Sequence, residues 1–119
     1  MESILTSIKK LLGITEEYTH FDTDLIIHIN SVFFVLKDLG VGPSKGFRIK
    51  DKESKWTDFL SEDDDLEAVK TYIYLKVKLL FDPPVGSALE SMNRVISEFE
   101  WRLKEDAEDA RRIGKDGVE

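Results

Sequence analysis

The stretch Leu79–Leu103, LLFDPPVGSALESMNRVISEFEWRL, decides the fold of this chain. Proline disfavours the helical conformation in the residue before it, so Pro83 must end the preceding helix near Phe81. Ser87 and Glu90 then match a capping box, the S-x-x-E pattern that starts a new helix at the following residue. A connection this short makes the two helices antiparallel neighbours, which is the basic unit of a helical bundle.

The second of these helices has one apolar face and one aromatic residue far from it. The apolar face consists of Leu89, Met92, Ile96, Phe99 and Leu103. At 100° per residue, Trp101 lies roughly 160° from Phe99, the centre of that face. Either the indole is a lone exposed aromatic or the N-terminal helix folds over it, or Trp101 and the adjacent Arg102 contact another subunit or a head protein. The last explanation fits an interface anchor, an aromatic side chain rimmed by charges.

Three further helices are predicted from the periodicity of apolar residues. The first spans residues 4–12, and the second runs from Asp22, interpreted as its N-cap, to Leu39. The third covers residues 65–81, and its apolar residues span roughly half of the circumference, so we expect it at the centre of the fold. Lys76 lies within that apolar arc. It either extends to water or pairs with a carboxylate at a buried or intersubunit position.

The second helix also has apolar residues on the face opposite its main apolar stripe. Ile27 and Phe34 lie there, beside the polar residues Asn30 and Ser31. They pack either against a second element of the same chain or against another subunit. We retain both as candidate interface residues.

Between the second and third long helices the helical period disappears over residues 41–56. Phe47 and Ile49 alternate with polar residues, and a polar turn follows. This pattern predicts a short, exposed, hairpin-like excursion that Trp56 closes. The overall prediction is therefore an all-α fold, a small bundle of about four helices with one such excursion.

The composition fits a single globular domain without catalytic chemistry. The chain has 119 residues, of which 41% are hydrophobic, and it has no cysteine, which excludes disulfides and Cys-based zinc sites. No apolar run reaches the ~18 residues needed to span a membrane. No nucleophile–base set, phosphate loop or Rossmann glycine pattern is present, so neither an enzyme nor a cofactor is expected. Asp63–Asp65 lack the spacing of a calcium loop, so no metal site is expected.

The charge is segregated along the chain. The net charge of −7 argues against a general nucleic-acid binder. Yet residues 44–55 contain five basic and two acidic side chains, whereas residues 61–67 contain five acidic side chains and no basic one. These segments are either two solvated loops or complementary patches that meet across a subunit boundary. Within the basic segment, Phe47, Arg48, Ile49 and Lys50 are candidate contact residues.

Several motifs resemble the head–tail connector (adaptor) family of tailed bacteriophages and prophages. They are the sequence FDPP at residues 81–84, the block EFEWRL at residues 98–103, the helix of residues 22–40 followed by VGP, and WTDF at residues 56–59. The resemblance covers most of residues 1–104, and its motifs are structural. We therefore predict a helical connector domain at residues 1–104, followed by a mixed-charge extension, residues 105–119, that is either helical or disordered.

The resemblance implies a structural virion protein that forms a ring under the portal. Such a ring, twelve-fold on the portal, would continue the DNA channel and dock the next head-completion or tail protein. Its expected partners are other copies of itself, the portal and that next protein, with DNA only passing through and no membrane involved. Assembly would take place in the host cytoplasm. The alternative is a non-enzymatic helical regulatory module that binds one phage or host protein as a monomer or dimer.

Overall fold

The computed structural model describes the backbone of residues 3–60 and 64–117, and the side chains of residues 3–60 and 66–109. Within these residues the fold is all-α and contains no strand, which confirms the predicted fold class. The helices are α1 (Ile4–Leu12), α2 (Asp22–Leu39), α3 (Trp56–Phe59), α4 (Asp64–Phe81) and α5 (Ser87–Gly117).

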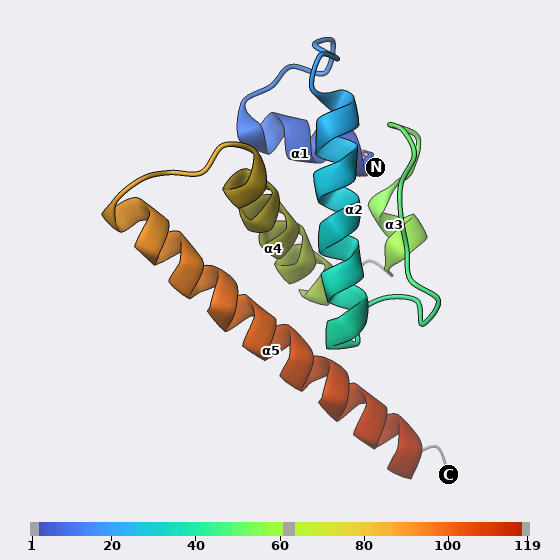
Figure 1. The fold of residues 1–119 in the computed structure, drawn as a ribbon. Helices are drawn as coiled ribbons and strands as arrows, with labels where there is room; N and C mark the ends of the chain where they lie inside the picture. Colours follow the sequence, from blue (N-terminus) through green and yellow to red (C-terminus); the bar gives the residue numbers. More distant parts are fainter. Residues whose placement is uncertain (1–2, 61–63, 118–119) are drawn as a thin grey trace.

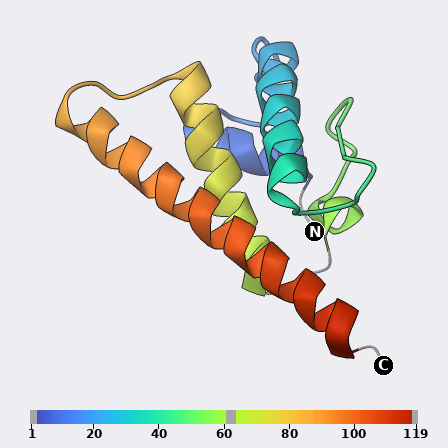
Figure 2. The same ribbon diagram turned by 60° about the horizontal axis from the view of Figure 1, so that its bottom comes forward.

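Helix α4 is the centre of the bundle, as its two apolar stripes predict. It contacts α1, α2 and α5. Figure 1 shows α5 running antiparallel to α4 after the connection that contains the proline pair, and Figure 2 shows α1 crossing behind α4 and α2. At 1.5 Å per residue, the 31 residues of α5 extend about 46 Å, against about 27 Å for the 18 residues of α4. The C-terminal part of α5 therefore projects beyond the bundle.

The helix ends mostly follow from local sequence signals. Gly13 and Gly40 adopt left-handed conformations, with φ of 84° and 90°, and cap α1 and α2. The predicted N-cap at Asp22 is wrong, because Phe21 takes that position and Asp22 is the first helical residue. The predicted cap at Ser87 is likewise one residue off, because α5 begins at Ser87 and the Gly86 carbonyl accepts the first intrahelical bonds.

The core forms where α1, α2 and α4 meet. It also includes residues from the excursion, from α3 and from α5. Its fully buried members are Ile4, Leu5, Ile8, Leu25, Ile29, Val32, Phe33, Leu36, Ile49, Trp56, Phe59, Leu66, Val69, Tyr72, Ile73, Val77, Ile96 and Leu103. Helix α5 supplies only Ile96 and Leu103 to this set. The other residues of its predicted apolar face are half-buried or partly exposed. Helix α5 is therefore an outer helix of the bundle.

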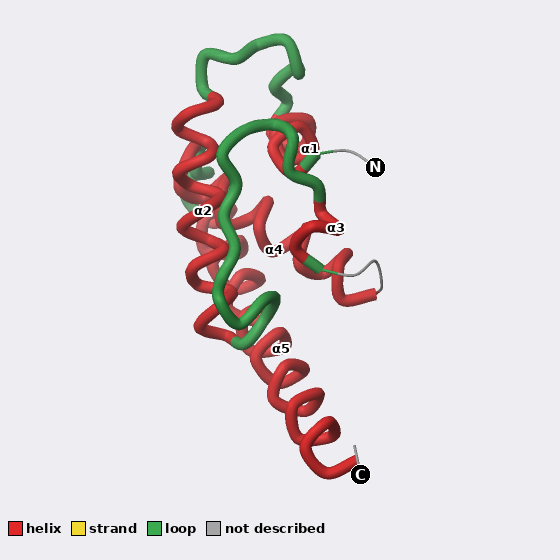
Figure 3. The backbone as a smooth tube through the Cα atoms, turned by 90° about the vertical axis from the view of Figure 1, so that its right-hand side faces the viewer, coloured by secondary structure: helices red, strands yellow, loops and turns green. Residues whose placement is uncertain are grey.

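The segment between α2 and α3 is a loop. The predicted pairing of two short strands into a hairpin is therefore wrong. No strand forms among residues 41–55, and the only ladder-like contact there is an isolated bridge between Ser3 and Lys55. Figure 3 shows the loop running along α2 before it reaches α3. A side chain of α2 supplies the bonds that a hairpin partner would have made, as described below.

Helix α5 continues through the predicted extension to Gly117. The division into a connector domain and an extension stays a prediction. Among the described residues, no helix combines the length and the apolar character that crossing a membrane requires.

Candidate protein-interaction surface

Three large apolar side chains predicted at interfaces are exposed on two long helices. Ile27 and Phe34 on α2 are 59% and 65% exposed, and Trp101 on α5 is 64% exposed. The N-terminal helix therefore does not cover the indole. Arg102, the next residue, is also exposed, and it lies beside a shallow surface between α4 and α5. Each helix buries its other face in the core, so these side chains are held on rigid elements.

The excursion is tied to α2 by one asparagine. The Asn30 side chain accepts a hydrogen bond from the backbone N–H of Ile49 at 2.7 Å and donates one to the Ile49 carbonyl at 2.9 Å. These two bonds satisfy the backbone groups of Ile49 in the way that a neighbouring strand would. The loop is therefore held against the helix without a hairpin.

The prediction that Ile49 and Trp56 contact another protein is wrong, because both belong to the protomer's own core. Ile49 and Trp56 are each only 1% exposed. The alternation that suggested an exposed strand instead turns Ile49 inward between exposed Arg48 and Lys50. Neither side chain is accessible to another protein in the folded protomer.

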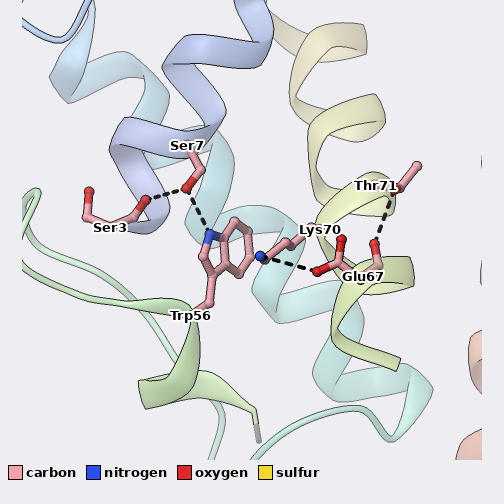
Figure 4. A network of polar contacts seen from close by, with 6 residues as sticks. All are labelled: Ser3, Ser7, Trp56, Glu67, Lys70 and Thr71. Atoms are coloured by element: carbon pink, nitrogen blue, oxygen red, sulfur yellow. Dashed lines mark hydrogen bonds and ion pairs between the residues drawn. The ribbon is translucent and has the colours of Figure 1, made fainter. Parts of the chain in front are cut away.

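Trp56 is buried by contacts from distant parts of the chain. Its indole N–H donates a hydrogen bond to the Ser7 hydroxyl at 2.9 Å, and the Ser7 hydroxyl donates one to the Ser3 carbonyl at 2.6 Å (Figure 4). The Lys70 ammonium lies 5.6 Å from the centroid of the ring, within range of a cation–π contact. This network joins α1, α3 and α4, so Trp56 has a structural role.

Lys76 forms an ion pair within the chain. Its ammonium lies 3.5 Å from a Glu100 carboxylate oxygen that also accepts a hydrogen bond from the Tyr72 hydroxyl at 2.7 Å. Burial raises the pKa of Tyr72 well above its usual range, and the bond to the negatively charged Glu100 raises it further. Lys76 therefore links α4 to α5 inside one protomer.

A groove with an aromatic floor lies between α2 and the excursion. Its volume is about 470 Å³. Phe33 and Phe47 form its floor, with ring centroids 5.0 Å apart in an edge-to-face arrangement. Exposed Phe34 stands at the rim, together with the cations Lys37, Lys45 and Arg48.

The structure thus brings Phe34, Phe47 and Arg48 together, but leaves other candidates elsewhere. Ile27 lies two turns from Phe34 on α2, Lys50 lies outside the groove, and Trp101 lies on α5. The sequence did not indicate that Asn30 holds the excursion against α2 or that Lys37 lines the groove. The sequence places Asn30 beside Phe34 on the second face of α2, but it does not identify the hydrogen-bonding partner of Asn30.

Some predicted features lie outside the described part of the chain or add nothing to the surface. The acidic segment at residues 61–67 falls largely among residues that the structure does not describe. Within residues 3–60 and 66–109, no group of three or more His, Asp or Glu side chains is arranged to hold a metal ion.

Fold and surface together define a class: a small all-helical protein with large aromatic side chains exposed on its outer helices and a cationic groove. This chain belongs to the phage connector protein family, whose family model matches residues 4–110. Searches of curated proteins and of solved structures gave no match. Membership confirms the resemblance seen in the sequence and makes the chain a structural phage protein of the head–tail connector type. It also implies contact with other virion components.

Proposed function

We propose that this protein is a head–tail connector that assembles as a ring beneath the portal, twelve-fold when bound there. The ring continues the DNA channel and presents a surface to the next head-completion or tail protein. In this role the protein has no catalytic activity and binds no cofactor. Assembly takes place in the host cytoplasm, and the finished ring is part of the virion.

The observation that carries this proposal is the exposure of Ile27, Phe34 and Trp101 on helices whose opposite faces form the core. Apolar surface contributes roughly 25 cal/mol per Å² when it is removed from water. Aromatic residues surrounded by charges are also the side chains most enriched at interaction hot spots. Repeated contacts between copies would cover such surfaces on every protomer.

The net charge of −7 agrees with a channel protein that DNA passes without binding. Like charges repel, so an acidic wall would not retain the duplex. In a gel-shift titration at physiological salt, we expect no retention of duplex DNA by the assembled ring. Tight duplex binding would contradict this part of the proposal.

Native mass spectrometry with the cognate portal tests the proposal directly. We expect the chain to add to the portal ring in a number of copies that matches the portal subunits. Complexes with one or two copies of the chain, or with a different partner and no portal, would instead support a regulatory module. No binding to the portal would refute the connector function.

Trp101→Ala separates assembly from folding. Because the indole is 64% exposed, we expect the melting temperature of the monomer to stay nearly unchanged. Assembly should weaken by about 2 kcal/mol or more, the loss typical of a hot-spot residue. Val85→Ala is the matched control, because Val85 is 84% exposed in the loop before α5. A large fall in monomer stability for Trp101→Ala would place the indole in a structural role.

A further inference from the structure

The groove between α2 and the excursion is preformed. The two hydrogen bonds from Asn30 to Ile49 fix the loop against the helix. Gly46 lies close to the Lys37 side chain, since an added Cβ would come within 3.3 Å of Lys37 Cδ. A volume of about 470 Å³ is within the range of roughly 300–1,000 Å³ that binding clefts usually have. The groove can therefore receive a large side chain without reorganisation.

The cations around this groove have no anionic partner in the described residues. Elsewhere, Lys9, Lys76 and Lys78 each lie within 4.0 Å of a carboxylate oxygen. For Lys37, Lys45 and Arg48, no carboxylate oxygen of the described residues lies within that distance. An apolar floor with unpaired cations at its rim fits an aromatic side chain that is flanked by carboxylates.

Helix α5 carries a segment with that chemistry. Trp101 is 64% exposed, and residues 98–109 contain six carboxylates against two basic side chains. Glu98 and Glu105 lie one turn before and one turn after Trp101, on the same side of the helix. Both are exposed.

We propose that Trp101 of one copy inserts into the groove beside Phe34 and Phe47 of the next copy. The carboxylates that flank the indole then pair with Lys37, Lys45 and Arg48. This inference rests on the proposed ring and names the contact that joins its neighbours.

The arrangement of the two surfaces suits a ring. Figures 1 and 3 place the excursion on one side of α2 and α5 on the other. A contact between two different surfaces of identical copies is heterologous, and it generates a closed ring when the rotation between neighbours closes. A pairing of Trp101 with Trp101 would instead stop at a dimer.

Cross-linking between two serine positions tests this contact, because the natural chain has no cysteine. Ser44 is exposed beside Lys45, and Ser97 is exposed one turn before Trp101. Ser44→Cys and Ser97→Cys leave the aromatic side chains and the cations unchanged. We expect a short bismaleimide to link the two variants when they are mixed on the portal, with much lower yield for either variant alone.

Two controls make the readout specific. Ser87→Cys changes another exposed serine of α5 that lies 14 residues from Trp101, about 21 Å along the helix, and should not link to Ser44→Cys. Adding Trp101→Ala to the Ser97→Cys chain should lower the yield at least tenfold. Efficient linking of Ser97→Cys to itself would show a symmetric contact and overturn the proposal.

The outcomes separate this inference from the proposed function. If copies bind the portal with full stoichiometry but Ser44→Cys and Ser97→Cys do not link, the connector function stands and the proposed contact is wrong. A link from Ser44→Cys to a portal subunit would assign the groove to a different virion protein and would also overturn the inference. Cross-linking without portal binding would support the contact and refute the portal-bound ring.

A charge reversal within the excursion supplies an independent measurement. Lys45→Glu places a carboxylate at the rim of the groove, whereas Lys52→Glu makes the same change at an exposed lysine of the same loop that does not line it. We expect Lys45→Glu to weaken association between copies at least tenfold more than Lys52→Glu. Equal effects of the two variants would contradict pairing at the groove.

Discussion

Alkaline pH should destabilise this protein through Tyr72. Its side chain is fully buried in α4, and its hydroxyl donates a hydrogen bond of 2.7 Å to Glu100 on α5. Burial, followed by the interaction with Glu100, raises the pKa of Tyr72 above its usual range, so the folded state keeps the phenol neutral. In the unfolded chain the phenol ionises near pH 10.

The sign of the effect follows from proton binding. Because the folded pKa is the higher one, the stabilisation from Tyr72 is complete below about pH 10 and is lost as the pH rises above it. Above that pH the unfolded state binds one proton fewer than the folded state. The slope of the free energy of unfolding therefore approaches about −1.4 kcal/mol per pH unit well above pH 10, and about 1.4 kcal/mol in total is lost between neutral pH and pH 11.

Urea denaturation between pH 7 and pH 11 measures this loss, and buried Trp56 provides a fluorescence signal for unfolding. Lysines titrate in the same range, so the comparison with Tyr72→Phe isolates the contribution of the phenol. Tyr72→Phe should lower stability by about 1.5–3 kcal/mol at pH 7, since it removes a hydrogen bond to a charged group. Above pH 10 its stability should depend less steeply on pH than that of the natural chain. Equal slopes for the two proteins would refute the reasoning.

Three further substitutions test the contacts that hold the fold. Asn30→Ala should lower the free energy of unfolding by about 1–3 kcal/mol and speed hydrogen exchange at the Ile49 amide, because it leaves that backbone without its partner. Lys9→Met should lower stability by about 2 kcal/mol in urea titrations, because Asp22 loses the ammonium 2.9 Å away. Leu75→Pro should destabilise central helix α4 by about 3 kcal/mol or more, visible as loss of helical circular dichroism.

The helices could be predicted because their signals are local. The ends of α1 and α2 depend on Gly13 and Gly40, and the end of α4 depends on Pro83, each within two residues of the last helical position. The apolar periodicity of each long helix also gave the direction of its core-facing side. The same periodicity places Trp101 and Phe34 on faces opposite the core-facing side of their helices.

The excursion could not be predicted because its contacts are long-range. Ile49 is bonded to a residue 19 positions earlier, and the Trp56 indole to a hydroxyl 49 positions earlier. Alternating apolar residues are compatible both with a hairpin and with a loop that inserts one side chain into a core. The partner that decides between them, Asn30, is a polar residue in a helix, and nothing in its local sequence identifies what it binds.

The same architecture explains why the proposed contact surfaces can be both exposed and well ordered. Phe34 follows buried Phe33, and Trp101 lies between half-buried Phe99 and buried Leu103, so the core fixes the backbone beneath each exposed aromatic ring. A side chain held on such a backbone loses less conformational freedom on binding than one on a mobile loop. The groove's second wall is a loop, and Asn30 gives it a comparable restraint. Contacts between copies would therefore depend on the stability of each protomer, and the loss of the loop restraint in Asn30→Ala should weaken assembly as well as folding.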